Sequence, residues 1–209
     1  MASIPLKKHD NVAGSFWSQW SLFFRQFVRH PGMIGSVIPS SAALVDRMLD
    51  QVDWRSTRLF VEYGPGVGTF TRSILDRLPA DATLLAIDLN PDFAAWLETH
   101  IDDPRLRVVQ GSAADVRRFI REAGHYQADY VLSGIPFSTL PDGVGPQICA
   151  ETKAALRPGG SFLIYQYSRF VIRLLRPLFG EISDALEWRN IPPCRMIRAT
   201  REEELAQAA

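Results

Sequence analysis

The stretch Leu59-Phe60-Val61-Glu62-Tyr63-Gly64-Pro65-Gly66-Val67-Gly68-Thr69-Phe70 decides how the rest of this 209-residue chain is organised. It opens with a short apolar run, long enough for one buried strand. Three glycines follow within five positions, and glycine allows backbone angles closed to other residues. Apolar residues at helical spacing between positions 70 and 78 then predict a helix, with Thr69 or Thr71 as its N-cap. The segment therefore predicts a strand, a tight turn and a helix whose first N–H groups face a bound molecule.

The spacing of the glycines indicates which molecule that is. A dinucleotide site uses G-x-G-x-x-G, so that a pyrophosphate sits at the helix N-terminus. Here the pattern is G-x-G-x-G with Glu62 two residues before the first glycine. This resembles the first motif of class I S-adenosylmethionine (SAM) methyltransferases. SAM carries a methionine amino and carboxylate group in place of phosphates, so an acid near the turn is useful. The alternative is an ordinary glycine-rich turn beside two surface acids.

A second acid, Asp88, ends the apolar run 83–88, twenty residues past Gly68, where a carboxylate can accept both ribose hydroxyls. The turn 111–113 follows the next predicted strand, and in the fold that the resemblance implies it contacts the adenine. The loop before residue 42 could close over the methionine end through serine hydroxyls, although plain helix capping is an equal alternative for any one serine. The predicted cofactor-binding residues are Ser36, Ser40, Glu62, Gly64, Gly66, Asp88, Leu89, Ser112, Ala113 and Ser133.

The composition is that of a soluble globular protein, with 46% hydrophobic and 22% charged residues. Formal net charge is +0, which argues mildly against a nucleic-acid enzyme and leads us to expect no nucleic-acid partner. Cys149 and Cys194 are too far apart in sequence to form a metal-ligand pair, and we expect no metal. No signal peptide is evident, and the uncharged run 11–24 is too short to span a bilayer.

The first thirty residues predict an amphipathic helix. Aromatic and aliphatic residues between positions 16 and 28 fall on one helical face, and Lys and Arg flank them. Such a helix suits the headgroup boundary of an anionic membrane, so residues 11–29 are a predicted membrane contact. Packing of the same face on the catalytic domain is the alternative. The segment 169–179 mixes three arginines with apolar residues and is a second candidate, unless it is a packed helix with snorkelling arginines.

Strands and helices alternate along the rest of the chain. Strands are predicted at 58–63, 83–88, 105–110, 130–132 and 161–167, with helices near 69–78, 91–97, 114–123 and 146–156, and a closing hairpin at 187–190 and 195–200. This order predicts an α/β, doubly wound, Rossmann-like sheet with an N-terminal amphipathic helical arm. We expect an arm and cofactor-covering helix at 1–50 and a methyltransferase domain at 51–209. Ligands in such sheets lie beyond the carboxyl ends of the strands.

The segment Ser133-Gly134-Ile135-Pro136-Phe137 follows the fourth strand. It resembles the Asn-x-Pro-aromatic motif of methyltransferases that act on amino nitrogens, including the rRNA adenine dimethylases, but glycine stands in place of the Asn. A base nitrogen would lose a side-chain contact there, while a bulkier aliphatic amine would gain room. Phe137 could face a methylated ammonium, or could be a core residue. The predicted catalytic residues are Ser133, Gly134, Ile135, Phe137 and Tyr167, and the candidate bases are Tyr167, Tyr165 and His30.

The whole chain resembles bacterial phospholipid N-methyltransferases. The resemblance rests on the glycine turn, the 133–137 loop, and two arm segments, Phe27-Val28-Arg29-His30-Pro31 and Ile34-Gly35-Ser36-Val37-Ile38-Pro39-Ser40-Ser41. It implies SAM as cofactor, S-adenosylhomocysteine as product, and methylation of phosphatidylethanolamine towards phosphatidylcholine by a cytoplasmic enzyme peripheral on the inner face of the membrane. Ornithine lipids are the substrate of near relatives. The rivals are an RNA adenine N6-methyltransferase, a small-molecule or protein N-methyltransferase that docks on membranes, and a non-catalytic SAM sensor.

Overall fold

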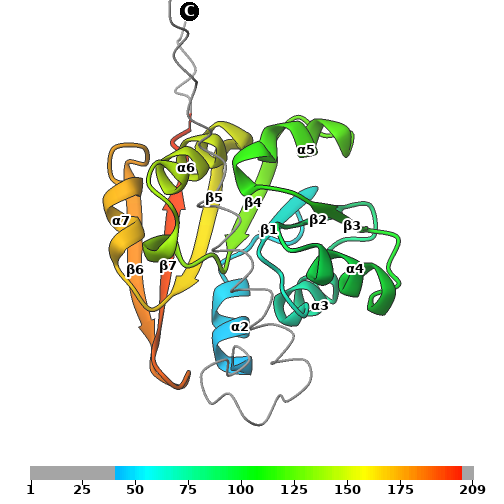
Figure 1. The fold of residues 1–209 in the computed structure, drawn as a ribbon, viewed down its shortest axis with the longest axis horizontal. Helices are drawn as coiled ribbons and strands as arrows, with labels where there is room; N and C mark the ends of the chain where they lie inside the picture. Colours follow the sequence, from blue (N-terminus) through cyan, green and yellow to red (C-terminus); the bar gives the residue numbers. More distant parts are fainter. Residues whose placement is uncertain (1–40, 204–209) are drawn as a thin grey trace, which may run out of the picture. The chain divides into compact units, whose positions relative to one another are not determined.

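A computed structural model describes residues 41–203 of the chain. The predicted membrane helix at 11–29, together with Ser36, Ser40 and His30, lies outside the described residues. The centre of the described part is a seven-stranded sheet in the order β3-β2-β1-β4-β5-β7-β6 (Figure 1). Its strands are β1 (Leu59–Tyr63), β2 (Thr83–Asp88), β3 (Leu106–Gln110), β4 (Ala128–Ser133), β5 (Leu156–Gln166), β6 (Glu181–Glu187) and β7 (Cys194–Thr200).

The first five strands are parallel, and the last two close the sheet as an antiparallel hairpin. β1 pairs with β2 and β4, β2 with β3, and β4 with β5, all in parallel. β7 runs antiparallel to both β5 and β6. Parallel neighbours need crossover connections, which the helices between strands provide. The predicted Rossmann-like, doubly wound fold is confirmed.

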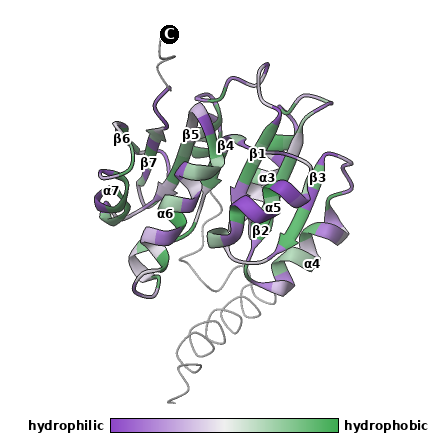
Figure 2. Ribbon diagram, turned by 90° about the horizontal axis from the view of Figure 1, so that it is seen from above, coloured by the Kyte–Doolittle hydropathy of each residue, from purple (hydrophilic) through white to green (hydrophobic). Residues whose placement is uncertain are grey.

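Helices cover both faces of the sheet and divide the core into two layers. One face carries α5 (Val116–Glu122), α6 (Val144–Ala155) and α7 (Phe170–Leu175), and the other carries α2 (Ala42–Leu49), α3 (Thr69–Leu75) and α4 (Pro91–His100). The central strands are buried on both sides, so they are apolar almost throughout, as the green strands of Figure 2 show. The apolar face of α2 packs in the same core as β1 and α3. The domain boundary at residue 50 stays a prediction.

Two of the helices that begin at the carboxyl edge of the sheet have side-chain caps, whereas α3 does not. Ser41 caps α2 by accepting from the Leu44 N–H, and Asn90 caps α4 with Pro91 in its first turn. The exception is α3. Its N-cap is Gly68, at φ 79° and without a side-chain cap, so the prediction of a Thr69 or Thr71 cap is wrong. The turn ends in a left-handed residue, which glycine tolerates and threonine does not.

Two boundaries differ from the predicted ones near the end of the chain. The first strand of the hairpin lies at 181–187, and residues 188–193 form the turn, so the prediction of a strand at 187–190 is wrong. Apolar residues alternate weakly in 181–187 because it is an edge strand with one half-exposed face. β5 begins at Leu156, before the Pro158-Gly159 pair that indicated a turn, and its pairing with β4 is irregular there.

Candidate active site

The carboxyl ends of β1, β2 and β4 meet at one edge of the sheet. Tyr63, the last residue of β1, is in register with Ile87 on one side and Ser133 on the other. The Gly64 N–H donates to the Ile87 carbonyl at 3.0 Å, and the Gly134 N–H donates to the Tyr63 carbonyl at 3.2 Å. The glycine turn, Asp88 and the 133–137 loop are therefore neighbours, as the strand order predicts.

Glu62 is a buried carboxylic acid under the glycine turn. It is 2% exposed, and the Thr71 hydroxyl donates to its Oε2 at 2.7 Å. Burial raises the pKa of Glu62 to about 8, although the Thr71 hydrogen bond opposes the rise. No described residue donates to its second oxygen and no described cation pairs with it. A buried acid in this state can bind a positively charged amino group.

Asp88 holds the glycine turn to the end of β2. Its Oδ2 accepts from the Gly66 N–H at 3.3 Å, and its Oδ1 accepts from the Asn90 N–H at 2.9 Å. Burial also raises the pKa of this carboxyl, to about 6, against the effect of the two backbone hydrogen bonds. Each oxygen has a lone pair left, so the carboxylate can accept from the two hydroxyls of a ribose.

These residues fit SAM. Two buried carboxyls without a cationic partner in the described part of the chain stand beside a turn whose Gly64 and Gly66 have φ of 66° and 57°. A Cβ at either glycine would make only ordinary contacts, 3.6 Å from Ile135 and 3.8 Å from Phe93. These two glycines are therefore required by their backbone conformation, and the absence of a Cβ at each leaves room for a ligand to approach the turn.

The predicted adenine contacts lie beside Asp88. The Gly111 N–H donates to the Asp88 carbonyl at 2.8 Å, which brings the turn after β3 to the end of β2. Ser112 caps a short 3₁₀ helix, Ala113–Asp115, by accepting from the Ala114 N–H at 3.2 Å. Leu89 is half-buried and Ala113 is buried. Ser112 is therefore in the predicted place, with its side chain shaping the turn.

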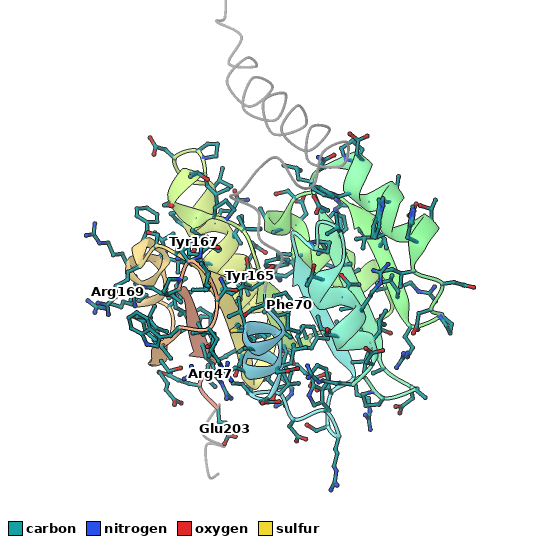
Figure 3. The ribbon with its side chains drawn as sticks, turned by 90° about the horizontal axis from the view of Figure 1, so that it is seen from below. Arg47, Phe70, Tyr165, Tyr167, Arg169 and Glu203 are labelled. Carbon is teal, nitrogen blue, oxygen red and sulfur yellow. The ribbon has the colours of Figure 1, made fainter. Side chains whose placement is uncertain are left out.

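The acceptor side of the site is built around Gly134. The ring of Tyr165, on the neighbouring strand β5, lies directly on the Gly134 backbone, so that a Cβ at residue 134 would be 2.6 Å from the ring carbon Cζ. The same ring stacks on Phe70 of α3 with centroids 4.5 Å apart. Figure 3 shows Tyr165 and Phe70 together near the middle of the sheet, with Tyr167 and Arg169 farther out. The sequence departure at Gly134 thus makes room for a tyrosine.

The Tyr165 hydroxyl is neutral at physiological pH. Burial raises its pKa, and the nearby carboxyls of Glu62 and Asp88 raise it further. No described residue forms a hydrogen bond with this hydroxyl. It is therefore unsuited to the role of general base and can instead accept a hydrogen bond from an amine.

The other three residues of the predicted catalytic loop lie in or beside the core. Phe137 is 1% exposed and packs edge-on against Phe162 in the core, so the expectation that its ring faces a substrate ammonium is wrong. Ser133 is fully buried, and its hydroxyl accepts from the Ile135 N–H at 3.1 Å, which shapes the loop. Ile135 is half-buried beside Gly64. The Pro-Phe pair anchors the loop through its apolar contacts.

Tyr167 lies one residue beyond the end of β5 and is 57% exposed. Burial raises the pKa of its hydroxyl, and the side chain of Asn190 is nearby. Sequence reasoning named Tyr165 only as a possible base and Thr71 only as a possible cap. The sequence signal that points to Tyr165 is the alternation of side chains along a strand, because residues 163, 165 and 167 share one face.

Comparisons with known proteins agree with this geometry. Residues 60–160 match the family described as "Methyltransferase domain". The chain is 32% identical over 178 residues to the ornithine lipid N-methyltransferase of Singulisphaera acidiphila, covering 82% of this chain and 91% of that protein. It is also 32% identical over 108 residues to the ribosomal RNA small subunit methyltransferase H of Parvibaculum lavamentivorans, covering 50% of this chain but 31% of that protein.

Among solved structures, the Burkholderia thailandensis 1,6-didemethyltoxoflavin-N1-methyltransferase, crystallised with S-adenosylhomocysteine, superposes with a TM-score of 0.64. The match covers 97% of this chain and 94% of that one at 18% identity, which shows a shared fold. The chain is a class I SAM-dependent methyltransferase. Within that class it belongs to the same family as the Singulisphaera protein.

Proposed function

We propose that the chain transfers methyl groups from SAM to the amine of a membrane lipid, and that an ornithine lipid is a better substrate than phosphatidylethanolamine. The observation that carries the proposal is the nearly full-length similarity to a protein named as an ornithine lipid N-methyltransferase. The resemblance to phosphatidylethanolamine methyltransferases rests on shorter motifs. Phosphatidylethanolamine is therefore the second substrate to test. Both substrates present an aliphatic amine beside an acyl-chain anchor.

The buried carboxyls hold the cofactor in this proposal. Glu62 faces the methionine ammonium, Asp88 accepts the ribose hydroxyls, and the turn with Ser112 and Ala113 lines the adenine side. Bound SAM supplies an electrophilic methyl group on a sulfonium. Gly64 and Gly66 let the backbone approach the methionine end, which fixes the direction of that methyl group.

The acceptor amine binds beside Gly134 and Tyr165. An aliphatic ammonium has a pKa near that of lysine, about 10.4, so it must lose a proton before it reacts. With SAM held by Glu62 and Asp88, a neutral amine nitrogen beside Tyr165 would take the sulfonium methyl group, and the electron pair of the broken carbon–sulfur bond would stay on the sulfur of S-adenosylhomocysteine. The Tyr165 hydroxyl accepts a hydrogen bond from the remaining N–H, and its ring face stabilises the methylated ammonium. The lost proton passes to solvent.

Membrane contact brings the lipid to this site. The predicted amphipathic helix at 11–29 and the arginines of 169–179 are the proposed contacts with an anionic, inner-face membrane surface. Within residues 41–203 no helix is both apolar enough and long enough to cross a bilayer. Arg169 is paired with Asp184 at 2.9 Å but stays 66% exposed, so it can still reach a phosphate.

The decisive experiment offers the full-length protein radiolabelled SAM together with one acceptor at a time. The acceptors are vesicles containing ornithine lipid, vesicles containing phosphatidylethanolamine, and ribosomal RNA. We expect label in the ornithine lipid, less in phosphatidylethanolamine, and none in RNA. Equal or greater label in phosphatidylethanolamine would restore the phospholipid assignment, and label only in RNA would remove the lipid assignment.

A second measurement tests the arm. Deletion of residues 1–30 should abolish sedimentation with anionic vesicles while SAM affinity remains measurable by calorimetry. A truncated protein that sediments as the full chain does would contradict a membrane role for 11–29.

A further inference from the structure

The turn between β6 and β7 carries two large apolar side chains that face solvent. Trp188 is 71% exposed and Ile191 is 72% exposed. Within residues 41–203 five large apolar side chains are exposed, from 41% to 93%, and four of them, Tyr167, Phe170, Trp188 and Ile191, follow β5 or lie in this turn. The fifth, Tyr126, precedes β4 and lies at the opposite, amino end of the strands. Exposed apolar groups concentrated at one place indicate a binding surface.

This turn lies at the edge of the sheet that carries the candidate active site. Gln166, the last residue of β5, pairs with Arg195, and Glu187 pairs with Cys194 across the hairpin. Residues 188–193 therefore extend past the carboxyl end of β5, whose Tyr165 contacts Gly134. Exposed Tyr167 lies between the two, near the Asn190 side chain.

The turn is held in one shape by the residues between its two apolar side chains. Asn190 is 2% exposed; its Oδ1 accepts from the Ser41 N–H at 3.0 Å, and its Nδ2 donates to the Pro192 carbonyl at 2.8 Å. Arg189 donates to the buried Glu187 through Nε at 3.0 Å. Because these hydrogen bonds fix the backbone of the turn, Trp188 and Ile191 are held in their exposed positions.

Positive charge accompanies the apolar side chains. Arg173 and Arg176, on the segment that follows Phe170, are exposed, and neither has an ion-pair partner among the described residues. An exposed tryptophan on a protein that also carries arginines without ion-pair partners after β5 suits contact with an anionic lipid surface. A protein partner would need about 800 Å² of surface on this side, far more than two side chains at a turn provide.

We propose that residues 188–193, called here the hairpin tip, enter the headgroup layer of an anionic membrane through Trp188 and Ile191. The tip consists of other residues than the predicted contacts at 11–29 and 169–179, and it adds to the second of these. With the tip inserted, the edge of the sheet that carries Tyr165 faces the bilayer, so a lipid amine reaches Gly134 without leaving its leaflet. This inference rests on the lipid substrate proposed above, but its test does not depend on which lipid is methylated.

The test compares two full-length variants in sedimentation with vesicles of phosphatidylglycerol and phosphatidylcholine. Trp188→Ala with Ile191→Ala removes the two apolar side chains of the tip, and Tyr126→Ala removes an even more exposed aromatic residue at the opposite, amino end of the strands. We expect vesicle affinity to fall about tenfold or more in the tip variant and to stay unchanged in the control. SAM affinity, measured by calorimetry, should be unchanged in both, which shows that the fold is intact.

The outcomes separate the two proposals. Vesicle binding by the tip variant equal to that of the unmodified chain would overturn the role of the tip, even if lipid methylation is found. Loss of vesicle binding without any lipid methylation would keep the tip as a membrane contact and overturn the proposed function. An equal loss in the Tyr126 control would mean nonspecific apolar adhesion and would also overturn the tip proposal.

Discussion

Tyr165 and Gly134 fit together as a large and a small residue on adjacent strands, with the ring carbon Cζ 2.6 Å from where a Cβ on residue 134 would lie. The side chain of an asparagine at position 134 would clash with Tyr165 where it now lies. The pair therefore replaces one polar side chain of the amino-methylating motif by a hydroxyl from the next strand. The Tyr165 ring fills the space that a side chain at 134 would occupy, so the expectation that glycine there gives a bulkier amine more room is wrong, while a hydrogen-bonding group is kept beside the loop.

Tyr165→Phe should lower kcat/KM for the lipid about tenfold, because one hydrogen bond of about 1.4 kcal/mol to the amine is lost. The ring, its stacking on Phe70 and SAM affinity should remain. Tyr167→Phe discriminates between the two tyrosines: if it lowers kcat/KM and Tyr165→Phe does not, the sequence-based assignment of Tyr167 is right. Steady-state kinetics with vesicle substrate give both values.

Gly134→Ala should lower kcat about a hundredfold, because the new methyl group displaces the Tyr165 ring by the order of an ångström. The double variant Gly134→Ala, Tyr165→Leu should recover thermal stability but keep a lowered kcat/KM, since the steric conflict is gone but so are the hydroxyl and the ring. Thermal denaturation and kinetics on the four proteins of this cycle check the coupling. Additive effects would mean that the two residues do not act together.

We expect the Glu62 carboxyl to release its proton when SAM binds. Its pKa is about 8 in the protein without cofactor, so at pH 7 the carboxyl is mostly protonated, and pairing with an ammonium requires the ionised form. Calorimetry at pH 7 in two buffers of different ionisation enthalpy should show release of nearly one proton. Glu62→Gln should bind SAM more weakly and release none.

The same group makes the cofactor-free protein less stable as pH rises. The folded-state pKa of about 8 exceeds the ordinary 4.5, so the contribution of Glu62 is complete below pH 4.5 and is lost as pH rises through 8. Urea unfolding at pH 6 and pH 8 should therefore show a smaller difference in Glu62→Gln than in the unmodified chain. An equal difference would mean that the carboxyl is already ionised at pH 6.

Asp88→Ala should weaken SAM binding about a hundredfold, corresponding to about 3 kcal/mol for two hydrogen bonds from ribose hydroxyls to a charged acceptor. Asp92→Ala is a matched control, because that carboxyl is exposed in the first turn of α4. Calorimetric titration with SAM measures both. If Asp88→Ala kept the SAM affinity of the unmodified chain, the ribose would not bind at Asp88.

From the sequence one can place the residues of the candidate cofactor half together but not those of the candidate acceptor half, for a physical reason. Glu62, Gly64 and Gly66 belong to one strand-turn-helix unit, so local spacing fixes their relation, and Asp88 follows from the next strand. Gly134 and Tyr165 come from different strands. Their contact depends on the register that pairs Ser133 with Ile164, which no local pattern reveals.

Burial explains the remaining differences. Phe137 and Tyr167 are both aromatic residues near strand ends, and either could face a substrate from sequence alone. The structure buries the first against Phe162 and leaves the second exposed. The hairpin tip was missed because residues 188–190 were predicted to belong to a strand, and because the exposure of a tryptophan depends on tertiary structure.

Substitution of Gly68 tests how strongly the turn depends on this glycine, without any ligand. Its φ is 79°, and a Cβ there would lie 2.9 Å from Leu97 Cδ2 and 3.1 Å from Ile101 Cδ1. Gly124 has a similar φ of 86°, with nothing within 4 Å of an added Cβ. Alanine at 124 should cost about 1 kcal/mol from the backbone alone, and alanine at 68 about 2–4 kcal/mol, because overpacking is added to the same backbone term. Urea unfolding of the two variants measures the difference, and since α3 begins at Gly68, Gly68→Ala should also weaken SAM binding while Gly124→Ala should not. Equal unfolding free energies would mean that Leu97 moves aside without cost, so that the glycine is required only by the turn.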